Sequence, residues 1–186
     1  NYDFYDLKGS VESILDSLNI KNYEFEAESN NTTFHPGRCA NIICRDKKIG
    51  VIGEIHPTVA KNYSVGAKSY VAVLDIRELN ELANSNIQYK ALPKFPAVTR
   101  DMALLADDGV TVGEIEKIIK KCSGKILEDV KLFDVYKGEQ IESGKKSLAF
   151  SIIYRADDRT LTDDEISDVF DKTVRQLFEK TGAQLR

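Results

Sequence analysis

The chain has 186 residues, of which 42% are hydrophobic and 30% charged, a composition typical of a folded globular protein rather than a disordered one. Its 26 basic and 30 acidic side chains give a net charge of −4, which argues against a strongly basic module that binds nucleic acid by charge alone. No run reaches the roughly 18 apolar residues of a membrane span, so we expect no membrane partner. From the net charge we expect no DNA partner, and only a local or partner-supported contact with RNA.

The first part of the chain predicts a helix followed by short strands. Leu7, Val11 and Leu15 recur at helical spacing, with neither a signal peptide nor an initiator Met before them, so we expect a piece of a longer protein. The strand-like segments cover residues 23–28, 38–44, 49–52 and 70–76, and short helices are expected from Pro57 and over residues 76–83. A helix followed by consecutive strands favours an α+β module with an antiparallel sheet.

A boundary is predicted near residue 92. Pro93 and Pro96 are half of the four prolines, and they follow the polar stretch 84–88. Prolines clustered after a polar segment are typical of a linker. We therefore expect two domains, covering residues 1–92 and 93–186.

The second part predicts a β-α-β-β-α-β order. Capping boxes begin at Thr111 and Thr162, and each opens a helix with an apolar stripe that ends at a glycine, Gly124 or Gly182. Strands are expected at residues 98–106, 130–136 and 147–154, and a short one at 183–186. This order is that of the ferredoxin-like fold, in which both helices cover one face of an antiparallel sheet.

The strand at 147–154 predicts what the other sheet face carries. Leu148, Phe150, Ile152 and Tyr154 alternate with Ser147, Ala149, Ser151 and Ile153, so small and polar residues line the face without helices. An open sheet face of this kind can receive single-stranded RNA or another protein.

No catalytic or metal-binding motif is present. His35 and His56 each precede a proline and are expected in turns, and with Cys39 and Cys44 they match no zinc spacing. Cys39 and Cys44 are expected on opposite faces of one strand, and together with Cys122 they favour three reduced thiols in a cytoplasmic protein. We expect the chain itself to be non-catalytic.

A family resemblance rests on ordered motifs. Lys94-Phe95-Pro96-Ala97-Val98-Thr99-Arg100-Asp101, Leu132-Phe133-Asp134-Val135-Tyr136, Gly144-Lys145-Lys146-Ser147-Leu148 and Arg159-Thr160-Leu161-Thr162-Asp163-Asp164-Glu165, followed by the C-terminal Gly182-Ala183-Gln184-Leu185-Arg186, closely resemble the C-terminal ferredoxin-fold anticodon-binding domain of the bacterial phenylalanyl-tRNA synthetase β chain. In the first half, Phe34-His35-Pro36-Gly37-Arg38 and Ile52-Gly53-Glu54-Ile55-His56-Pro57 look like the part of that β chain just before it.

The resemblance implies a role in a larger enzyme. Residues 1–92 would be part of a copy of the class II synthetase core that has lost catalysis. The absence of Phe-Arg-x-Glu and of a glycine-rich stretch ending in Glu-Arg agrees with this. The intact enzyme would be an α2β2 phenylalanine–tRNA ligase that uses ATP and Mg²⁺ on its α chain, whereas this fragment would hold no cofactor.

The same resemblance implies that residues 93–186 bind the anticodon of the phenylalanine tRNA. Backbone contacts are expected from Arg100, Lys145 and Lys146, and base stacking from Phe133 and Tyr136. One of these two aromatic rings should face the helices, and Phe133 is the one expected in the core. Asp101 and Asp134 would bond to base edges or anchor Arg100. The alternative is a ferredoxin-like regulatory domain that binds a ligand or a protein, attached to an unrelated α+β module.

Overall fold

The computed structural model describes residues 2–66, 68–86, 89, 91–138 and 140–186. It divides into two compact units, Asn1–Tyr89 and Lys90–Arg186. Each unit has its own sheet and its own hydrophobic core, so we describe them separately.

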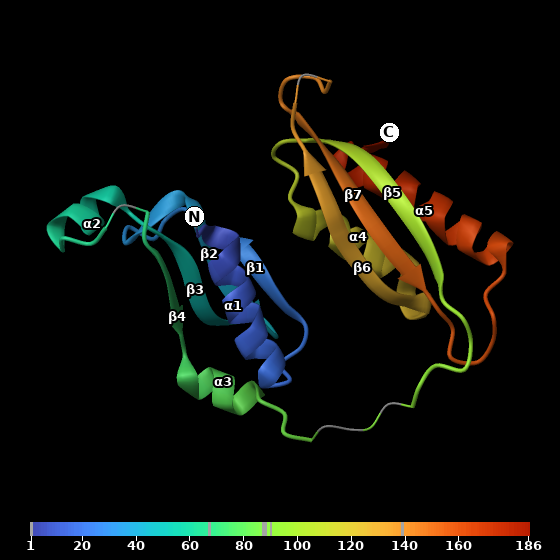
Figure 1. Ribbon diagram of the computed structural model, residues 1–186, viewed down its shortest axis with the longest axis horizontal. Helices are drawn as coiled ribbons and strands as arrows, with labels where there is room; N and C mark the ends of the chain where they lie inside the picture. The colour runs from blue at the N-terminus through green and yellow to red at the C-terminus, as the bar shows by residue number, and fades with distance from the viewer. Residues whose placement is uncertain (1, 67, 87–88, 90, 139) are drawn as a thin grey trace. The chain divides into compact units, whose positions relative to one another are not determined.

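The N-terminal unit is a four-stranded antiparallel sheet with helices. Its sheet has the order β1-β2-β3-β4 (Figure 1). The elements in chain order are α1 (Phe4–Ser17), β1 (Tyr23–Ala27), β2 (Phe34–Cys44), β3 (Lys47–Ile55), α2 (Pro57–Asn62), β4 (Tyr70–Leu74) and α3 (Ile76–Leu82). The predicted α+β arrangement is confirmed, although β2 and β3 extend well beyond the predicted segments.

Helix α1 covers one face of this sheet. Asp3 caps the helix by accepting hydrogen bonds from the backbone N–H groups of Tyr5 and Asp6 at 2.7 and 3.2 Å. Val11 and Leu15 are buried on its inner side and share a cluster with sheet residues that include Ile42 and Ile52. The 3.6-residue spacing of the apolar positions therefore gives the helix a single buried face.

Both histidines accept hydrogen bonds from nearby backbone N–H groups. His56 caps α2, since its Nδ1 accepts a hydrogen bond from the backbone N–H of Thr58 at 3.2 Å. His35 lies within β2 rather than in a free turn, and its Nδ1 accepts a hydrogen bond from the backbone N–H of Gly37 at 3.1 Å. The register of β2 against β3 shifts between Phe34 and Cys39.

Cys39, Cys44 and Cys122 are free thiols. Cys39 and Cys44 belong to different hydrophobic clusters, as expected for opposite faces of the strand.

The C-terminal unit has the predicted β-α-β-β-α-β order. Its elements are β5 (Val98–Asp107), α4 (Val112–Ser123), a 3₁₀ turn η1 (Gly124–Ile126), β6 (Leu127–Tyr136), β7 (Lys145–Tyr154), α5 (Asp163–Thr181) and β8 (Gln184–Leu185). The sheet order is β6-β7-β5-β8, and every described pairing is antiparallel. This is the ferredoxin-like arrangement, with the first and third strands at the centre.

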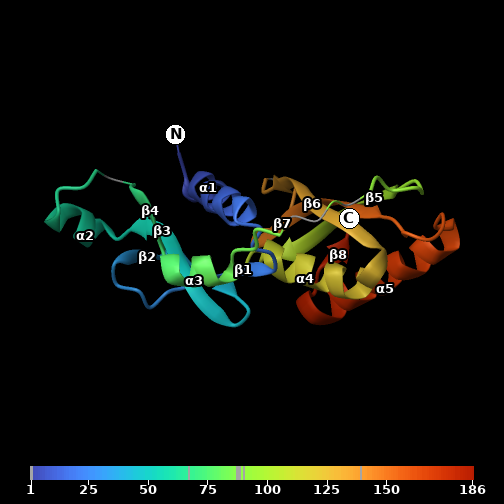
Figure 2. The ribbon, with the colours of Figure 1, turned by 90° about the horizontal axis from the view of Figure 1, so that it is seen from below.

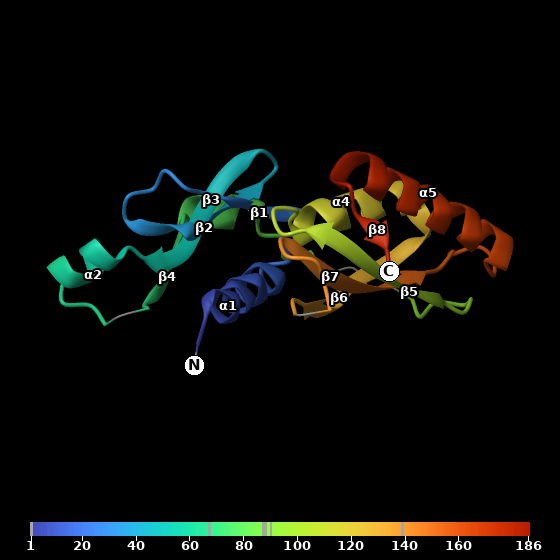
Figure 3. The ribbon, with the colours of Figure 1, turned by 90° about the horizontal axis from the view of Figure 1, so that it is seen from above.

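Both helices of this unit lie on the same side of the sheet, as Figures 2 and 3 show. Leu148, Phe150, Ile152 and Tyr154 are fully buried between them and the sheet. The two predicted capping boxes are present, because Thr111 and Glu114, and likewise Thr162 and Glu165, exchange hydrogen bonds. No helix formed by the described residues of this unit lies over the other side of the sheet, which leaves a face available for a partner.

Candidate nucleic-acid interface

The open face of the C-terminal sheet is defined by the strand register. Residues paired across neighbouring antiparallel strands point to the same side, so the row Leu105–Ser147–Tyr136 lies on the face opposite the buried Leu148. The adjacent rows bring in Ala103, Ala149 and Asp134, and then Asp101, Ser151 and Lys131. On this face β7 thus carries small side chains, β5 carries Leu105, Ala103 and Asp101, and an aromatic ring and charged groups stand at the β6 edge.

A β-bulge changes the position of Phe133. The β6–β7 register shifts between Leu132, which pairs with Phe150, and Asp134, which pairs with Ala149. The extra residue breaks the period-2 alternation, and Phe133 is 57% exposed. The expectation that Phe133 lies in the core is therefore wrong. Tyr136 pairs with Ser147 on the open face and is 38% exposed.

Lys145 and Lys146 lie on opposite faces of β7. Lys145 pairs with Asp107 on the open side, and its Nζ contacts the Glu142 carboxylate at 2.6 Å. Lys146 pairs with Ala106 on the helix side, where its Nζ donates to the backbone carbonyl of Asp108 at 2.9 Å. Both ammonium groups nevertheless belong to the same end of the sheet, since the two residues are adjacent in the chain.

The ionisation of these groups follows from their contacts. The hydrogen bond and charge of Glu142 raise the pKa of Lys145, and Lys145 in turn lowers the pKa of Glu142. Burial lowers the pKa of Lys146, and the nearby ammonium group of Lys137 lowers it further, while Asp108 and Glu114 oppose both effects. Lys137 and Lys146 both contact Asp108, one through its carboxylate and the other through its backbone carbonyl.

Arg100 and Asp101 are separated from the lysines. Arg100 shares the side of Met102 and Leu104, under the helices, and its guanidinium bonds to Asp163 at the start of α5 with a distance of 2.9 Å. Asp101 is on the open face and is not the anchor of Arg100. Arg100 lies seven residues along β5 from the partner of Lys145, about 23 Å at the usual strand rise.

The structure thus assembles most, not all, of the predicted set. Phe133, Asp134, Tyr136 and Lys145 lie on or beside one part of the open face, with Lys146 at its end, whereas Arg100 is on the covered side. Two residues absent from the predicted set join them, Ser147 opposite Tyr136 and Lys137 beside Asp108. Ser147 was identifiable from its place in the alternating strand; the position of Lys137 depends on a loop contact.

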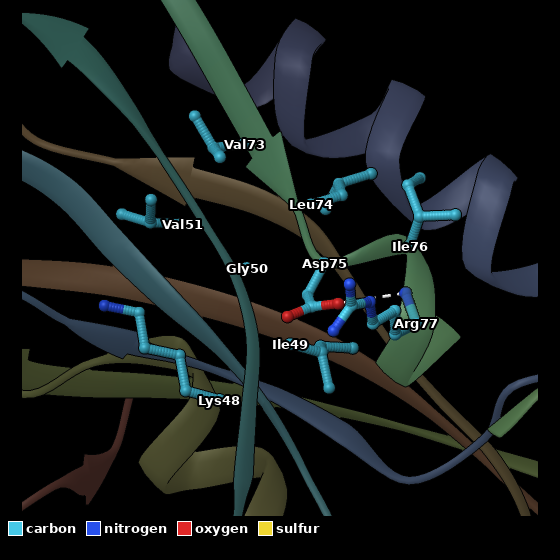
Figure 4. Close-up of a pocket in the computed structure, with 9 residues that line it drawn as sticks. All are labelled: Lys48, Ile49, Gly50, Val51, Val73, Leu74, Asp75, Ile76 and Arg77. Carbon is cyan, nitrogen blue, oxygen red and sulfur yellow. Dashed lines mark hydrogen bonds between the residues drawn. The ribbon is translucent and has the colours of Figure 1, made fainter. Parts of the chain in front are cut away.

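The N-terminal unit has a hollow of about 610 Å³ along β3 and β4 (Figure 4). Its charged lining residues are Lys48, Asp75 and Arg77. Asp75 already caps α3, because its Oδ1 accepts from the backbone N–H groups of Arg77 and Glu78 at 2.9 and 3.2 Å. Apart from these charged residues the hollow is lined by apolar residues and Gly50, and its one carboxylate is already used to cap α3.

The described residues form neither a metal-binding cluster nor a membrane-spanning helix. Among residues 2–66, 68–86, 89, 91–138 and 140–186, no group of three or more His, Cys, Asp or Glu side chains could hold a metal ion. In that same part of the chain, no helix combines the length and the apolar character needed to cross a membrane.

Comparison with known families assigns both halves of the chain. Residues 93–186 match the model described as the ferredoxin-fold anticodon binding domain, and residues 1–76 match the phenylalanyl tRNA synthetase beta chain CLM domain. The two matches occur in the order that the sequence motifs predicted.

Similar proteins cover the chain from end to end. The phenylalanine–tRNA ligase β subunit of Clostridium tetani is 53% identical over 184 residues, which are 99% of this chain and 23% of the relative. That of Clostridium acetobutylicum is 44% identical over 186 residues, and that of Bacillus subtilis is 41% identical over 184 residues. These alignments cover 100% and 99% of this chain, and 24% and 23% of the respective relatives.

The chain spans about a quarter of the length of these curated relatives. Because the alignments run through both units, they do not support an unrelated module joined to a ferredoxin-like regulatory domain. Among solved structures, one of Arabidopsis thaliana MSL1 aligns with a TM-score of 0.32 at 11% identity over 94% of this chain and 56% of that chain, too low for an argument about fold.

Proposed function

The chain belongs to the family of the ferredoxin-fold anticodon-binding domain, in the form found in phenylalanine–tRNA ligase β subunits, and from this membership we propose that its open sheet face binds the anticodon of the phenylalanine tRNA. The observation that supports this proposal is the composition of the face. Ala103 on β5 and Ser147, Ala149 and Ser151 on β7 are small residues of this face, while Phe133 and Tyr136 stand exposed on β6. Unpaired bases stack on exposed aromatic rings, and small neighbours let a base approach the sheet.

In this proposal each side chain has a separate task. Tyr136 and Phe133 stack on bases, while the Asp134 carboxylate offers an acceptor to a base edge on the open face. Lys145, with Lys146 beside it, faces the phosphate backbone. Arg100 has no place in this set, since it lies on the helix side and is paired with Asp163.

The N-terminal unit would support assembly with the catalytic α chain. The edge strand β4 exposes Val71 and Val73, at 36% and 56%, on the side of the sheet opposite to that of Leu74 in the same strand. Apolar residues on an unpaired edge strand are typical of a surface that a further strand or chain covers. We propose that the rest of the β chain and the α chain of an α2β2 enzyme cover it.

The activity belongs to the whole enzyme in this proposal. ATP and Mg²⁺ would serve the α chain of the whole enzyme, and this chain would hold neither. A cytoplasmic location fits the free thiols of Cys39, Cys44 and Cys122, which a reducing compartment maintains.

The test is a binding titration of this chain with a labelled anticodon stem–loop of the phenylalanine tRNA. We expect binding at about 50 mM salt that weakens steeply towards about 200 mM, and weaker binding of a stem–loop with a different anticodon. The matched variants are Tyr136→Ala on the open face and Val135→Ala on the same strand. Equal binding of both stem–loops, or equal loss in both variants, would contradict the proposal.

A further inference from the structure

Three lysines lie at the hairpin end of the C-terminal sheet, and each contacts an acidic residue through its carboxylate or its backbone carbonyl. Lys137 Nζ lies 2.6 Å from Oδ1 of Asp108, and Lys146 Nζ donates to the backbone carbonyl of the same Asp108 at 2.9 Å. Lys145 Nζ lies 2.6 Å from the Glu142 carboxylate. We call Lys137, Lys145 and Lys146 the hairpin lysines.

Backbone contacts keep these groups together. The N–H of Asp108 donates to the carbonyl of Gly144 at 2.8 Å, which ties the loop after β5 to the end of the β6–β7 connection. The N–H of Lys145 donates to the carbonyl of Glu142 at 3.1 Å, which closes the turn that carries their ion pair. The lysines and their carboxylates are therefore positioned by the fold and not only by mutual attraction.

The hairpin lysines adjoin the proposed anticodon surface. Tyr136 directly precedes Lys137 and pairs with Ser147, which is two residues from Lys145 on the same face of β7. A nucleotide stacked on Tyr136 would bring its backbone phosphates towards this end of the sheet. Phosphates at this end of the sheet would meet the ammonium groups of these lysines, but also the carboxylates that already pair with Lys137 and Lys145.

These ion pairs are exposed and can exchange. The Lys137 and Asp108 side chains are 56% and 47% exposed, and the Glu142 side chain is 75% exposed. Water and salt screen such pairs, so replacing a carboxylate by a phosphate is feasible. The two carboxylates must nevertheless be displaced, or must remain beside the incoming phosphate and repel it.

Resting on the proposed function, we propose that the hairpin lysines contact tRNA backbone phosphates, and that Asp108 and Glu142 limit the affinity by occupying these lysines in the unbound protein. The two acidic residues thus act as internal competitors of the RNA. A domain of this kind holds its tRNA weakly enough to release it, and its dependence on salt is set by a few local contacts.

The experiment measures the affinity of this chain for the anticodon stem–loop of the phenylalanine tRNA between about 50 and 200 mM salt. The variants are Lys137→Gln, Asp108→Asn, Glu142→Gln and the double variant Lys137→Gln/Asp108→Asn. Glu116→Gln is the matched control, since it removes the same charge from a lysine pair, Lys120–Glu116 at 3.5 Å, on helix α4. Thermal unfolding of each variant confirms that the exposed changes leave the fold intact.

We expect Asp108→Asn and Glu142→Gln each to raise the affinity about twofold to fivefold at low salt, the range of an exposed ion pair. Lys137→Gln should lower the affinity and reduce the slope of log affinity against log salt by about 1. In the Lys137→Gln background, Asp108→Asn should give a smaller gain, because its main partner is gone.

The outcomes separate the two proposals. If the unmodified chain does not bind the stem–loop at low salt, the proposed function itself fails. If it binds, but Asp108→Asn and Glu142→Gln bind no better, or Glu116→Gln gains as much as they do, the internal competition is overturned and only net charge matters. An unchanged salt slope in Lys137→Gln would show that Lys137 does not contact a phosphate.

Discussion

Tyr136 lies opposite Ser147 in the β6–β7 ladder, so the phenol ring and the Ser147 hydroxyl share the helix-free side of the C-terminal sheet. Its neighbour Val135 pairs with Leu148 on the helix side. Adjacent residues of one strand therefore present an aromatic ring to one face and an aliphatic group to the other, which provides a direct test of which face binds RNA.

Replacing Tyr136 by alanine should weaken binding of the anticodon stem–loop by about 1–3 kcal/mol, the contribution of one base stacked on an aromatic ring. Tyr136→Phe should keep most of the affinity, since the ring remains. The measurement is fluorescence anisotropy at a fixed low salt concentration. Val135→Ala serves as the control from the same strand, and a similar loss in this control would place the RNA elsewhere.

Phe133→Ala should cost little stability. The ring is 57% exposed, so its removal opens no cavity, and we expect a change below about 1 kcal/mol in the free energy of unfolding. Phe150 is fully buried, and Phe150→Ala should lose about 3–5 kcal/mol. Urea denaturation followed by circular dichroism compares the two variants. A loss of several kcal/mol in Phe133→Ala would show that the bulge does not expose this ring in solution.

Arg100→Ala should leave RNA binding and its salt slope unchanged, because the guanidinium lies on the helix side and bonds to Asp163. The pair is solvent-exposed, so the stability should fall by no more than about 1 kcal/mol. Asp163→Asn should give a similar small loss, since it breaks the same pair. A salt slope lowered by about 1 in Arg100→Ala would show that Arg100 does contact a phosphate.

Acid should weaken the N-terminal unit through Glu54. The hydrogen bond from Arg38 at 2.6 Å is the main cause that lowers the pKa of this buried carboxyl, burial opposes it, and Tyr70 adds a further hydrogen bond. A carboxyl whose pKa is lowered by folding stabilises the protein above its unfolded pKa of about 4.3. That stability is lost as the pH falls through the lower pKa of the folded state.

Glu54→Gln should therefore be less stable than the unmodified chain at pH 7, and the difference should shrink as the pH falls below about 4. Urea midpoints at a series of pH values test this, with the exposed Glu26→Gln of β1 as the control. A difference between Glu54→Gln and the unmodified chain that stays constant from pH 7 to about pH 3 would be inconsistent with an ionised Glu54 in the folded protein.

Much of the fold was predictable because its signals are local. The capping boxes at Thr111 and Thr162, and the alternation of Leu148, Phe150, Ile152 and Tyr154, depend on residues within a few positions of one another. Element ends were less accurate. β6 begins at Leu127 rather than at Val130, since pairing with β7 extends it beyond the apolar pattern.

The candidate site depended on contacts between distant residues. Alternation alone placed Phe133 in the core, but the shift in register against β7 turned it outward, and a bulge is a property of two strands rather than of one. Similarly, Arg100 and Asp163 are 63 residues apart in the chain, so their ion pair has no local signature.

The sequence by itself determined the β-α-β-β-α-β order, the antiparallel α+β module before it and the family. Apolar periodicity, helix capping and ordered motifs each depend on residues that are close together in the chain. Only the tertiary structure decided which side chains share the open face, and that Asp108 joins Lys137 and Lys146 at its end. These relationships follow from strand register and loop packing, and both depend on the distances between segments that folding brings together.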